Sequence, residues 1–270
     1  MSTATAGARS RLRRARADPG VREAWRVFAG SRLLVACVAA LAPVMLALSP
    51  QAHRDVPSLT HPFGSWPLGG VFGFFLSPLA HWDALWYLQI AQHGYMPTTL
   101  ATTPGSTVAF FPAYPSVVHV VAGFGGAAVT LVAATLVSLA AFFAALVVFQ
   151  RLVTLELGQR FARPALLLLA FFPVSFFFSA PYTESLFLLL SVGAFYAART
   201  GRWAAAGVLA AVASGTRNSG VLLILPLLVL YLYGPRPDGH RRALAAARGR
   251  LGALRPRYSL RWDVLWLLLT

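Results

Sequence analysis

Long apolar runs separated by short polar breaks are the feature that most constrains how this chain can fold. The runs cover residues 33–48, 127–149, 164–180, 185–198, 203–214, 221–233 and 264–270. About 20 apolar residues form a helix that crosses the roughly 30 Å of hydrocarbon in a bilayer. Because 57% of the residues are apolar and only 11% are charged, the chain has too little polar surface for a soluble globule. We therefore predict an all-α polytopic membrane protein.

The distribution of charge predicts which ends of these runs face the cytoplasm. All 23 basic residues are Arg, and positive residues accumulate on the cytoplasmic side of membrane proteins. If segment 110–124 stays outside, Arg54 and Arg217 alone lie outside, and the other 21 of the 23 Arg lie inside. This bias collapses if 110–124 crosses, so we prefer the non-crossing topology with a cytoplasmic N-terminus. Sidedness then explains the net charge of +15, and we predict no nucleic-acid partner.

These assignments divide the chain into four parts: an Arg-rich cytoplasmic tail (1–32), a membrane module (33–235), a basic cytoplasmic loop (236–261) and the start of a truncated span (262–270). The run 33–48 has no small-residue cleavage site before the next polar stretch, which predicts a retained signal anchor. The module includes an outer loop, 49–126, which is too long to be only a connection between two spans. Within it, 72–80 and 84–91 are amphipathic and suit helices that lie in the membrane interface.

The segment HWDALWYLQIAQHGY, residues 81–95, places the carboxylate of Asp83 among aromatic and histidine side chains. A charged group at membrane depth costs about 2.5–3.5 kcal/mol, so such groups persist mainly where they line a cavity or have a partner. Asp83 could act as a general base that takes the proton of an acceptor hydroxyl. It could instead cap the helix 84–91, since Asp is a favoured N-cap residue.

The predicted topology brings Glu184 and Arg217 to the same side as Asp83. Glu184 lies in PYTES, where a helix begins, so it could favour the positive end of that helix or contact substrate. Arg217 lies in TRNSG, at a break between two apolar runs. It could be a stray interfacial Arg, but a phosphate ligand at a helix break fits better. Three polar residues that open to one cavity predict a binding site for an anionic lipid head group.

Aromatic residues next to Asp83 have two interpretations. Trp82, Trp86 and Tyr87 could stack on a sugar face, or they could anchor the helix at the lipid head groups. For Trp86 and Tyr87, anchoring is the favoured interpretation.

Histidine residues add a third kind of candidate. His81, His93 and His119 could bind a divalent metal together with the two carboxylates, although their spacing matches no closed zinc pattern. His93 could instead bind a phosphate or a hydroxyl, and His119, amid Val residues, could be a packing residue. We therefore predict no defined metal site and leave a divalent cofactor open.

The motifs HWDALWYLQIAQHGY, FFPAYP, FFPVSFFFSAPYTESLFLLL and GTRNSG, in this order and spacing, resemble the Pig-V-type mannosyltransferase family of the GT-C class. The resemblance covers about residues 75–235 and implies a GT-C-like bundle of transmembrane helices. It implies that Asp83 is the catalytic base, that Glu184 and Arg217 line the site, and that the anomeric carbon inverts. Together with the motifs, it gives these substrate-binding candidates: His81, Trp82, His93, Tyr95, Tyr114, Tyr182, Glu184, Arg217 and Asn218.

Small departures accompany the resemblance. Thr183 stands where Ser is common, and Asn218-Ser219 stands where Ser-Asn is common, but Arg217 is kept. Family members also continue for further spans beyond the region present here, so we expect the 270 residues alone to be inactive or incomplete.

The predicted function is transfer of mannose from polyprenyl-phosphate-mannose to a lipid-linked or cell-surface acceptor, on the extracytoplasmic face of a bacterial plasma membrane. Membrane lipids are further expected partners. Two alternatives come from other classes of protein. One is a transporter or flippase for a lipid-linked anion, with Arg217 and Glu184 as gates. The other is a non-catalytic assembly subunit.

Overall fold

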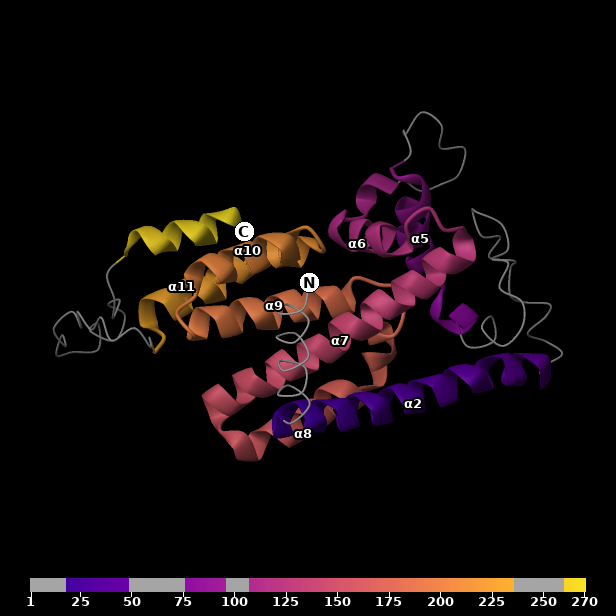
Figure 1. Cartoon of the computed structure of the whole chain (residues 1–270), viewed down its shortest axis with the longest axis horizontal. Coiled ribbons are helices and arrows are strands. Elements are labelled where there is room, and N and C mark those ends of the chain that lie inside the picture. Colours follow the sequence, from indigo (N-terminus) through magenta and orange to yellow (C-terminus); the bar gives the residue numbers. More distant parts are fainter. Residues whose placement is uncertain (1–17, 49–75, 96–106, 236–259) are drawn as a thin grey trace, which may run out of the picture.

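The described part of the chain is almost entirely helical. A computed structural model describes residues 18–48, 76–95, 107–235 and 260–270 (Figure 1). Helices account for 83% of these residues, which include no strand. Among the described residues, two helical stretches are long and apolar enough to cross a membrane. They are Pro19–Leu41, which is part of a helix that continues to Leu48, and Ala127–Leu157. The prediction of an all-α membrane protein is confirmed.

The α-helices are α2 (Pro19–Leu48), α5 (Ala84–His93), α6 (Ala113–Ala122), α7 (Ala127–Leu157), α8 (Gln159–Phe171), α9 (Glu184–Arg199), α10 (Trp203–Ser214) and α11 (Ile224–Tyr233). Short 3-10 helices connect or extend them: η1 (Ser77–Leu79), η3 (Thr107–Ala109), η4 (Pro173–Phe178), η5 (Asn218–Leu223) and η7 (Trp262–Leu269). The predicted outer loop is described only in part. Its residues 49–75 and 96–106 lie outside the described ranges, as does 236–259 of the predicted basic loop.

Helix α2 begins well before Leu33, where the apolar run predicts its start. Pro19 suits the first helical turn, because its missing N–H needs no partner there. Asp18 Oδ1 accepts a hydrogen bond from Gly20 N at 2.8 Å and so satisfies one free donor of that turn. Residues 19–32, which the sequence assigns to the Arg-rich tail, therefore form the first half of helix α2.

Two ion pairs dock this first half of α2 on neighbouring helices. Asp18 Oδ2 lies 3.4 Å from Arg151 Nη2 of α7, and Glu23 Oε1 lies 3.0 Å from Arg163 Nε of α8. Val27 is buried against both helices. These partners are distant in the sequence. The Arg-rich composition of 1–32 therefore did not predict the helix.

The predicted single run 164–180 is wrong, because the chain breaks after Phe171. Helix α8 ends there, and η4 follows from Pro173 to Phe178. Pro173 has no N–H to continue the helical hydrogen bonds. It also favours an extended residue before it, and Phe172 has φ −57° and ψ 138°. We call residues 172–183, between α8 and α9, the break segment.

Helices α7 to α10 alternate in direction and define two ends of the molecule. Glu156 near the end of α7 pairs with Arg199 at the end of α9, so these two helices run parallel, and α8 and α10 return. One end, the Arg-rich end, carries Arg151, Arg163 and Arg199. The other, the site end, holds α5, α6 and the starts of α7 and α9 (Figure 1). Which membrane face each end meets stays a prediction.

Helices α5 and α6 pack together against the start of α7 at the site end (Figure 1). The predicted interfacial helix 84–91 corresponds to α5. Leu88, Tyr114 and Leu131 form the core that joins the three helices. Helix α6 has 10 residues, or about 15 Å at 1.5 Å per residue, which is half the hydrocarbon thickness. This length favours the non-crossing prediction for 110–124.

Small residues let α9, α10 and η7 approach closely. Ala194, Ala206 and Ala210 are completely buried where α9 meets α10, as is usual for helix contacts in membranes. A Cβ on Gly207 would lie 2.1 Å from the carbonyl oxygen of Trp266 in η7. Because α10 is fixed from both sides, its C-terminal end is held in place at the site end.

Candidate functional site

Asp83 immediately precedes α5 at the site end, with its side chain exposed. The carboxylate makes no capping hydrogen bond to α5; instead its backbone carbonyl accepts bonds from Trp86 N at 3.1 Å and Tyr87 N at 3.3 Å. The N-cap interpretation of the carboxylate is therefore wrong. Trp82 beside it has φ 52°, a left-handed conformation that is uncommon for residues other than Gly. Strain of this kind concentrates at functional sites.

Glu184 and Arg217 form an ion pair across the site end. Arg217 Nη1 lies 2.7 Å from Glu184 Oε1, and the two side chains are 41% and 25% exposed. Glu184 is also the first residue of α9, so the favourable interaction with the helix end coexists with the pair. Glu184 Oε2 is buried and has no hydrogen-bond partner within the described residues. Arg217 is thus not a stray interfacial Arg but half of a partly buried pair.

Close backbone packing holds Arg217 in place. Arg217 is extended, with φ −156°, between the end of α10 and η5. A Cβ on Gly220 would lie 2.4 Å from the backbone N of Ser214, so only Gly allows η5 to fold back against α10. The carbonyl oxygen of Gly215 accepts a 2.9 Å hydrogen bond from Ala113 N of α6. Residues 215–220 are therefore fixed by both α6 and α10.

Tyr87 joins the three charged residues. Its hydroxyl lies near the buried side chain of Thr183. Burial raises the pKa of the Tyr87 hydroxyl, the interaction with Thr183 opposes this shift, the carboxylates of Glu184 and Asp83 raise the pKa, and Arg217 lowers it. Tyr87 is therefore within electrostatic range of both carboxylates and the guanidinium. We call Asp83, Tyr87, Glu184 and Arg217 the charged cluster.

Tyr182 connects the break segment to the loop that carries Asp83. Its hydroxyl donates a 2.8 Å hydrogen bond to the carbonyl oxygen of His81, and its ring packs against Ala84 and Tyr87. Burial raises the pKa of Tyr182 to about 12, so the hydroxyl keeps its proton at neutral pH. The side chain is only 7% exposed, and its hydrogen bond makes it a support for the loop.

Tyr114, Tyr95 and His119 make hydrogen bonds that support the fold of the site end. Tyr114 is completely buried, and its hydroxyl donates to Ala134 O at 3.0 Å. Tyr95 Oη donates to Phe110 O at 2.8 Å. His119 Nδ1 lies 2.7 Å from Ala91 O, which ties α6 to α5 and agrees with the packing interpretation of that histidine.

The remaining candidates lie at the surface. His81 and Trp82 are exposed beside Asp83, and Asn218 is exposed next to Arg217. His93, in contrast, is the last residue of α5, about 15 Å from Asp83 along the helix at 1.5 Å per residue. Within the described ranges, no three His, Cys, Asp or Glu side chains gather to hold a metal ion.

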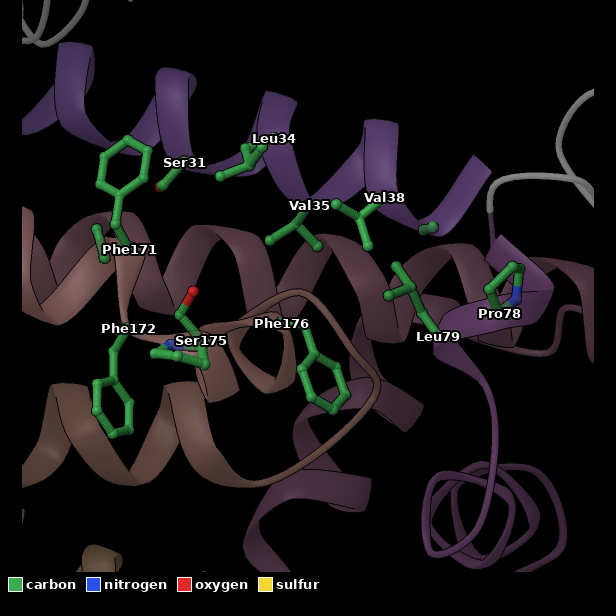
Figure 2. A pocket seen from close by; sticks show the side chains of 13 residues that line it. Ser31, Leu34, Val35, Val38, Pro78, Leu79, Phe171, Phe172, Ser175 and Phe176 are labelled. Carbon is green, nitrogen blue, oxygen red and sulfur yellow. The ribbon is translucent and has the colours of Figure 1, made fainter. Parts of the chain in front are cut away.

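An apolar pocket of about 310 Å³ lies between α2 and the break segment (Figure 2). Leu34, Val35 and Val38 of α2 face Phe172 and Phe176 across it (Figure 2). Leu79, which is two residues before His81, closes one side. Of the residues that line the pocket, only Ser31 and Ser175 have polar side chains. The pocket suits an apolar chain rather than a sugar.

Two functional residues were missed or misjudged from the sequence. Tyr87 was assigned to membrane anchoring, yet its ring packs edge-to-face against Phe110, Tyr114 and Tyr182. Its place four residues after Asp83, on the same helical face, was an available indication. Thr183 was noted only as a replacement for Ser, whereas its buried side chain lies near the Tyr87 hydroxyl. Nothing local to PYTES indicates that proximity.

Comparison with known proteins identifies relatives of one kind. A family model described as mannosyltransferase (PIG-V) matches residues 25–230. GPI alpha-1,6-mannosyltransferase 2 of Cricetulus griseus is 29% identical over 216 residues, which cover 77% of this chain and 42% of that protein. The protein of the same name from Mus musculus is 30% identical, over 76% of this chain and 41% of its own length.

A shorter match has higher identity. GPI mannosyltransferase 2 of Drosophila pseudoobscura pseudoobscura is 34% identical over 125 residues, or 43% of this chain and 26% of that protein. The chain spans less than half the length of these curated relatives. No solved structure matches it significantly. Because the family model covers residues 25–230, well over half of the chain, including the segments that hold Asp83, Glu184 and Arg217, the chain belongs to the PIG-V mannosyltransferase family.

Proposed function

We propose that this protein is the catalytic part of a membrane mannosyltransferase that uses polyprenyl-phosphate-mannose. The observation that carries the proposal is an exposed, uncapped carboxylate, Asp83, at the end of the molecule that also holds the Arg217–Glu184 pair; Tyr87 interacts electrostatically with all three. Transfer of a sugar from a phosphate needs a base for the acceptor and a cation for the leaving group. The charged cluster contains both. The names of the relatives, all mannosyltransferases, support the choice of sugar.

In the proposed reaction, an acceptor hydroxyl loses its proton to the Asp83 carboxylate while its oxygen attacks the anomeric carbon of mannose. The bond from that carbon to the phosphate oxygen breaks, and its electron pair stays on the departing polyprenyl phosphate. Attack from the face opposite the phosphate inverts the anomeric carbon. The proton ends on Asp83 and is later released to water.

Arg217 would stabilise the charge that develops on the departing phosphate. A guanidinium has five N–H donors arranged as a fork that matches phosphate oxygens. Among the described residues, one of these donors is used, by Glu184 at 2.7 Å. Glu184 therefore orients Arg217 and leaves donors for a ligand. Fixed donors aimed at developing charge are the largest single contribution in many enzymes.

The apolar pocket fits the lipid part of such a donor. It opens between α2 and the break segment and adjoins η1, which leads directly to His81 and Asp83. A polyprenyl chain beside the loop would place its phosphate toward the charged cluster. The acceptor we propose is lipid-linked or on the cell surface.

We also propose the orientation and the compartment. The Arg-rich end would face the cytoplasm and the site end the extracytoplasmic side, in accordance with the positive-inside rule. The Arg- and Ala-rich composition favours a bacterial plasma membrane. Labelling of cysteines introduced at positions 117 and 157 tests this: we expect an external reagent to reach 117 and not 157.

The function is tested with the full-length protein, labelled polyprenyl-phosphate-mannose and membranes that supply acceptors. We expect labelled mannose in the acceptor fraction and a loss of about 10²- to 10⁴-fold for Asp83→Asn, which removes the base. Asp18→Asn is the matched control. Asp18 pairs with Arg151, 17 residues beyond Ala134 and so about 25 Å along α7 from the Tyr114 contact. We expect it to retain activity.

The outcomes separate the alternatives. Undiminished transfer by Asp83→Asn would remove Asp83 from the mechanism. Movement of the labelled lipid between leaflets without transfer would favour a flippase. Comparison of the anomeric configuration of donor and product by NMR tests inversion.

A further inference from the structure

Arg32 lies in the middle of α2 and is only 9% exposed. Its guanidinium carbon sits 4.7 Å from the ring centroid of Phe142. Each of its five N–H donors has an acceptor. The acceptors are Ser31 Oγ for Nε (3.3 Å), Ser175 O and Ser179 Oγ for Nη1 (2.7 and 2.8 Å), and Ala170 O and Ser175 Oγ for Nη2 (3.1 Å each). We call these residues the Arg32 cluster.

All the hydrogen-bond acceptors of this buried cation are neutral oxygens. Within the described residues, no carboxylate forms an ion pair with Arg32. A buried charge is costly unless hydrogen bonds compensate it, and here five do so. A guanidinium suits this position because it offers five N–H donors in a planar fork, which no other side chain supplies.

The acceptors lie on both sides of the helix break. Ala170 O belongs to the last turn of α8, where carbonyl groups have no partner within the helix and a positive charge is favourable. Ser175 lies within η4, and Ser179 follows it. Figure 2 shows Ser175 on the side of the break segment that faces Ser31 of α2. Arg32 therefore joins the end of α8 to the break segment.

A short series of hydrogen bonds leads from this junction to the charged cluster. Ser185 Oγ donates to Phe178 O at 2.9 Å and fixes the start of α9, where Glu184 lies. Tyr182 Oη donates to His81 O at 2.8 Å and fixes the loop of Asp83. Only two residues separate Ser179, which Arg32 holds, from Tyr182. Through these hydrogen bonds, the break segment links α2 to the start of α9, where Glu184 lies, and to the loop that carries Asp83.

We propose that Arg32 is a positioning residue for the proposed transfer reaction: by holding the break segment against α2, it fixes where Tyr182 and Glu184 stand relative to Asp83. This inference rests on the proposed function for its effect on turnover. Its structural part, that Arg32 holds the break segment, is independent of what the site catalyses.

The experiment uses the full-length protein in membranes with Arg32→Met, which keeps the length of the side chain and removes all five donors. Arg163→Met is the matched control, because Arg163 also joins α8 to α2, through Glu23, but is exposed and remote from the break. In a Cys37→Ser background, a cysteine at buried Ala180 reports on the break segment. A cysteine at buried Ala206 of α10 reports on the rest of the bundle.

We expect Arg32→Met to raise the rate of maleimide labelling at position 180 about tenfold or more, because unsatisfied buried carbonyls favour local opening. Labelling at 206 should rise much less than labelling at 180, and Arg163→Met should change neither. In transfer assays kcat should fall about tenfold or more with KM for the donor unchanged, because misplaced catalytic groups mainly slow the reacting step. Arg32→Lys should recover little of either property.

Unchanged labelling at 180 would overturn the inference, and equal increases at 180 and 206 would show a general stability role instead. If Arg32→Met does not accumulate, the double variant Ser175→Ala with Ser179→Ala removes two acceptors with little change of volume. It should raise labelling at 180 alone, and no rise would overturn the inference. A wild type that transfers no mannose, with labelling at 180 raised by Arg32→Met, would refute the proposed function and leave the role of Arg32 standing.

Discussion

Arg32 and Arg217 are both cationic side chains within the apolar part of the chain, yet their surroundings differ. Arg32 is buried, all five of its donors have neutral acceptors, and it has no carboxylate partner among the described residues. The Arg217 side chain is 41% exposed and uses one donor, for Glu184. The first arginine is saturated by the protein, and the second keeps donors for something else.

This difference separates a structural cation from a binding one. A saturated guanidinium can bind no ligand without breaking bonds to the protein, so Arg32 acts through what it holds. Arg217 is oriented by one acidic partner and can still face an anion. The presence of an Arg in an apolar run therefore says little by itself, because the number of donors already in use decides its role.

Of the changes that test this comparison of the two arginines, the largest expected effect is at Arg217. Arg217→Gln should lower mannosyl transfer about 10²-fold or more, since it removes the donors proposed to face the leaving phosphate. Transfer assays at saturating acceptor measure this, with Arg163→Gln, an exposed ion-pair residue, as the control. Equal losses in the two variants would remove the distinction between the two arginines.

Substitution by Lys should lower the stability of the protein at Arg32 and leave it almost unchanged at Arg217. Arg32→Lys should lower stability by about 1–3 kcal/mol, because a compact ammonium with three donors leaves buried acceptors unsatisfied. Arg217→Lys should leave thermal unfolding within about 0.5 kcal/mol of wild type, as expected for a partly exposed pair, and lower transfer. Thermal unfolding in detergent checks both. A larger loss of stability for Arg217→Lys would reverse the comparison.

The tyrosines of the site predict a dependence on alkaline pH. The pKa of Tyr182 is about 12 in the folded protein against an ordinary 10.0, so the unfolded chain loses this proton first as pH rises. The contribution of Tyr182 to stability is then complete below pH 10 and is lost as pH rises toward 12. We expect Tm to fall over this interval and to fall less steeply in Tyr182→Phe. Parallel curves for both proteins would contradict this.

The smallest expected effect is at Tyr87. Tyr87→Phe removes the hydroxyl that interacts with Thr183 but keeps the ring that packs against Tyr114. One hydrogen bond contributes about 0.5–1.5 kcal/mol, so kcat should fall less than about tenfold. Tyr87→Ala should cost much more, because the ring is also part of the packing. A hundredfold loss in Tyr87→Phe would make the hydroxyl a participant in the chemistry.

The charged residues of the site were predictable because of where they stand. Asp83, Glu184 and Arg217 each interrupt an apolar pattern, and the predicted number of membrane crossings between them places them on one side. The partnership of Glu184 with Arg217 was not predicted, since 33 residues separate them. Tyr114 was counted as a substrate-binding candidate, and its complete burial against α7 could be seen only from the packed helices.

Residues 18–32 show the opposite case, because their Arg-rich composition predicted a tail where a helix packs. Asp18 and Glu23 are stabilised by Arg151 and Arg163, and no local pattern identifies partners that lie more than 130 residues away. The same holds for Arg32, whose acceptors lie on the far side of the break segment.

The sequence by itself determined the helical membrane class and the family motifs, and it predicted that the charged residues emerge on one side. These follow from hydropathy, charge and local spacing, which act along the chain. Only the tertiary structure decided that Asp83 is uncapped, that Tyr87 lies among the charged groups, and that one arginine is saturated while the other is not. Hydrogen-bond saturation depends on atoms from distant segments, so it exists only once the helices have packed.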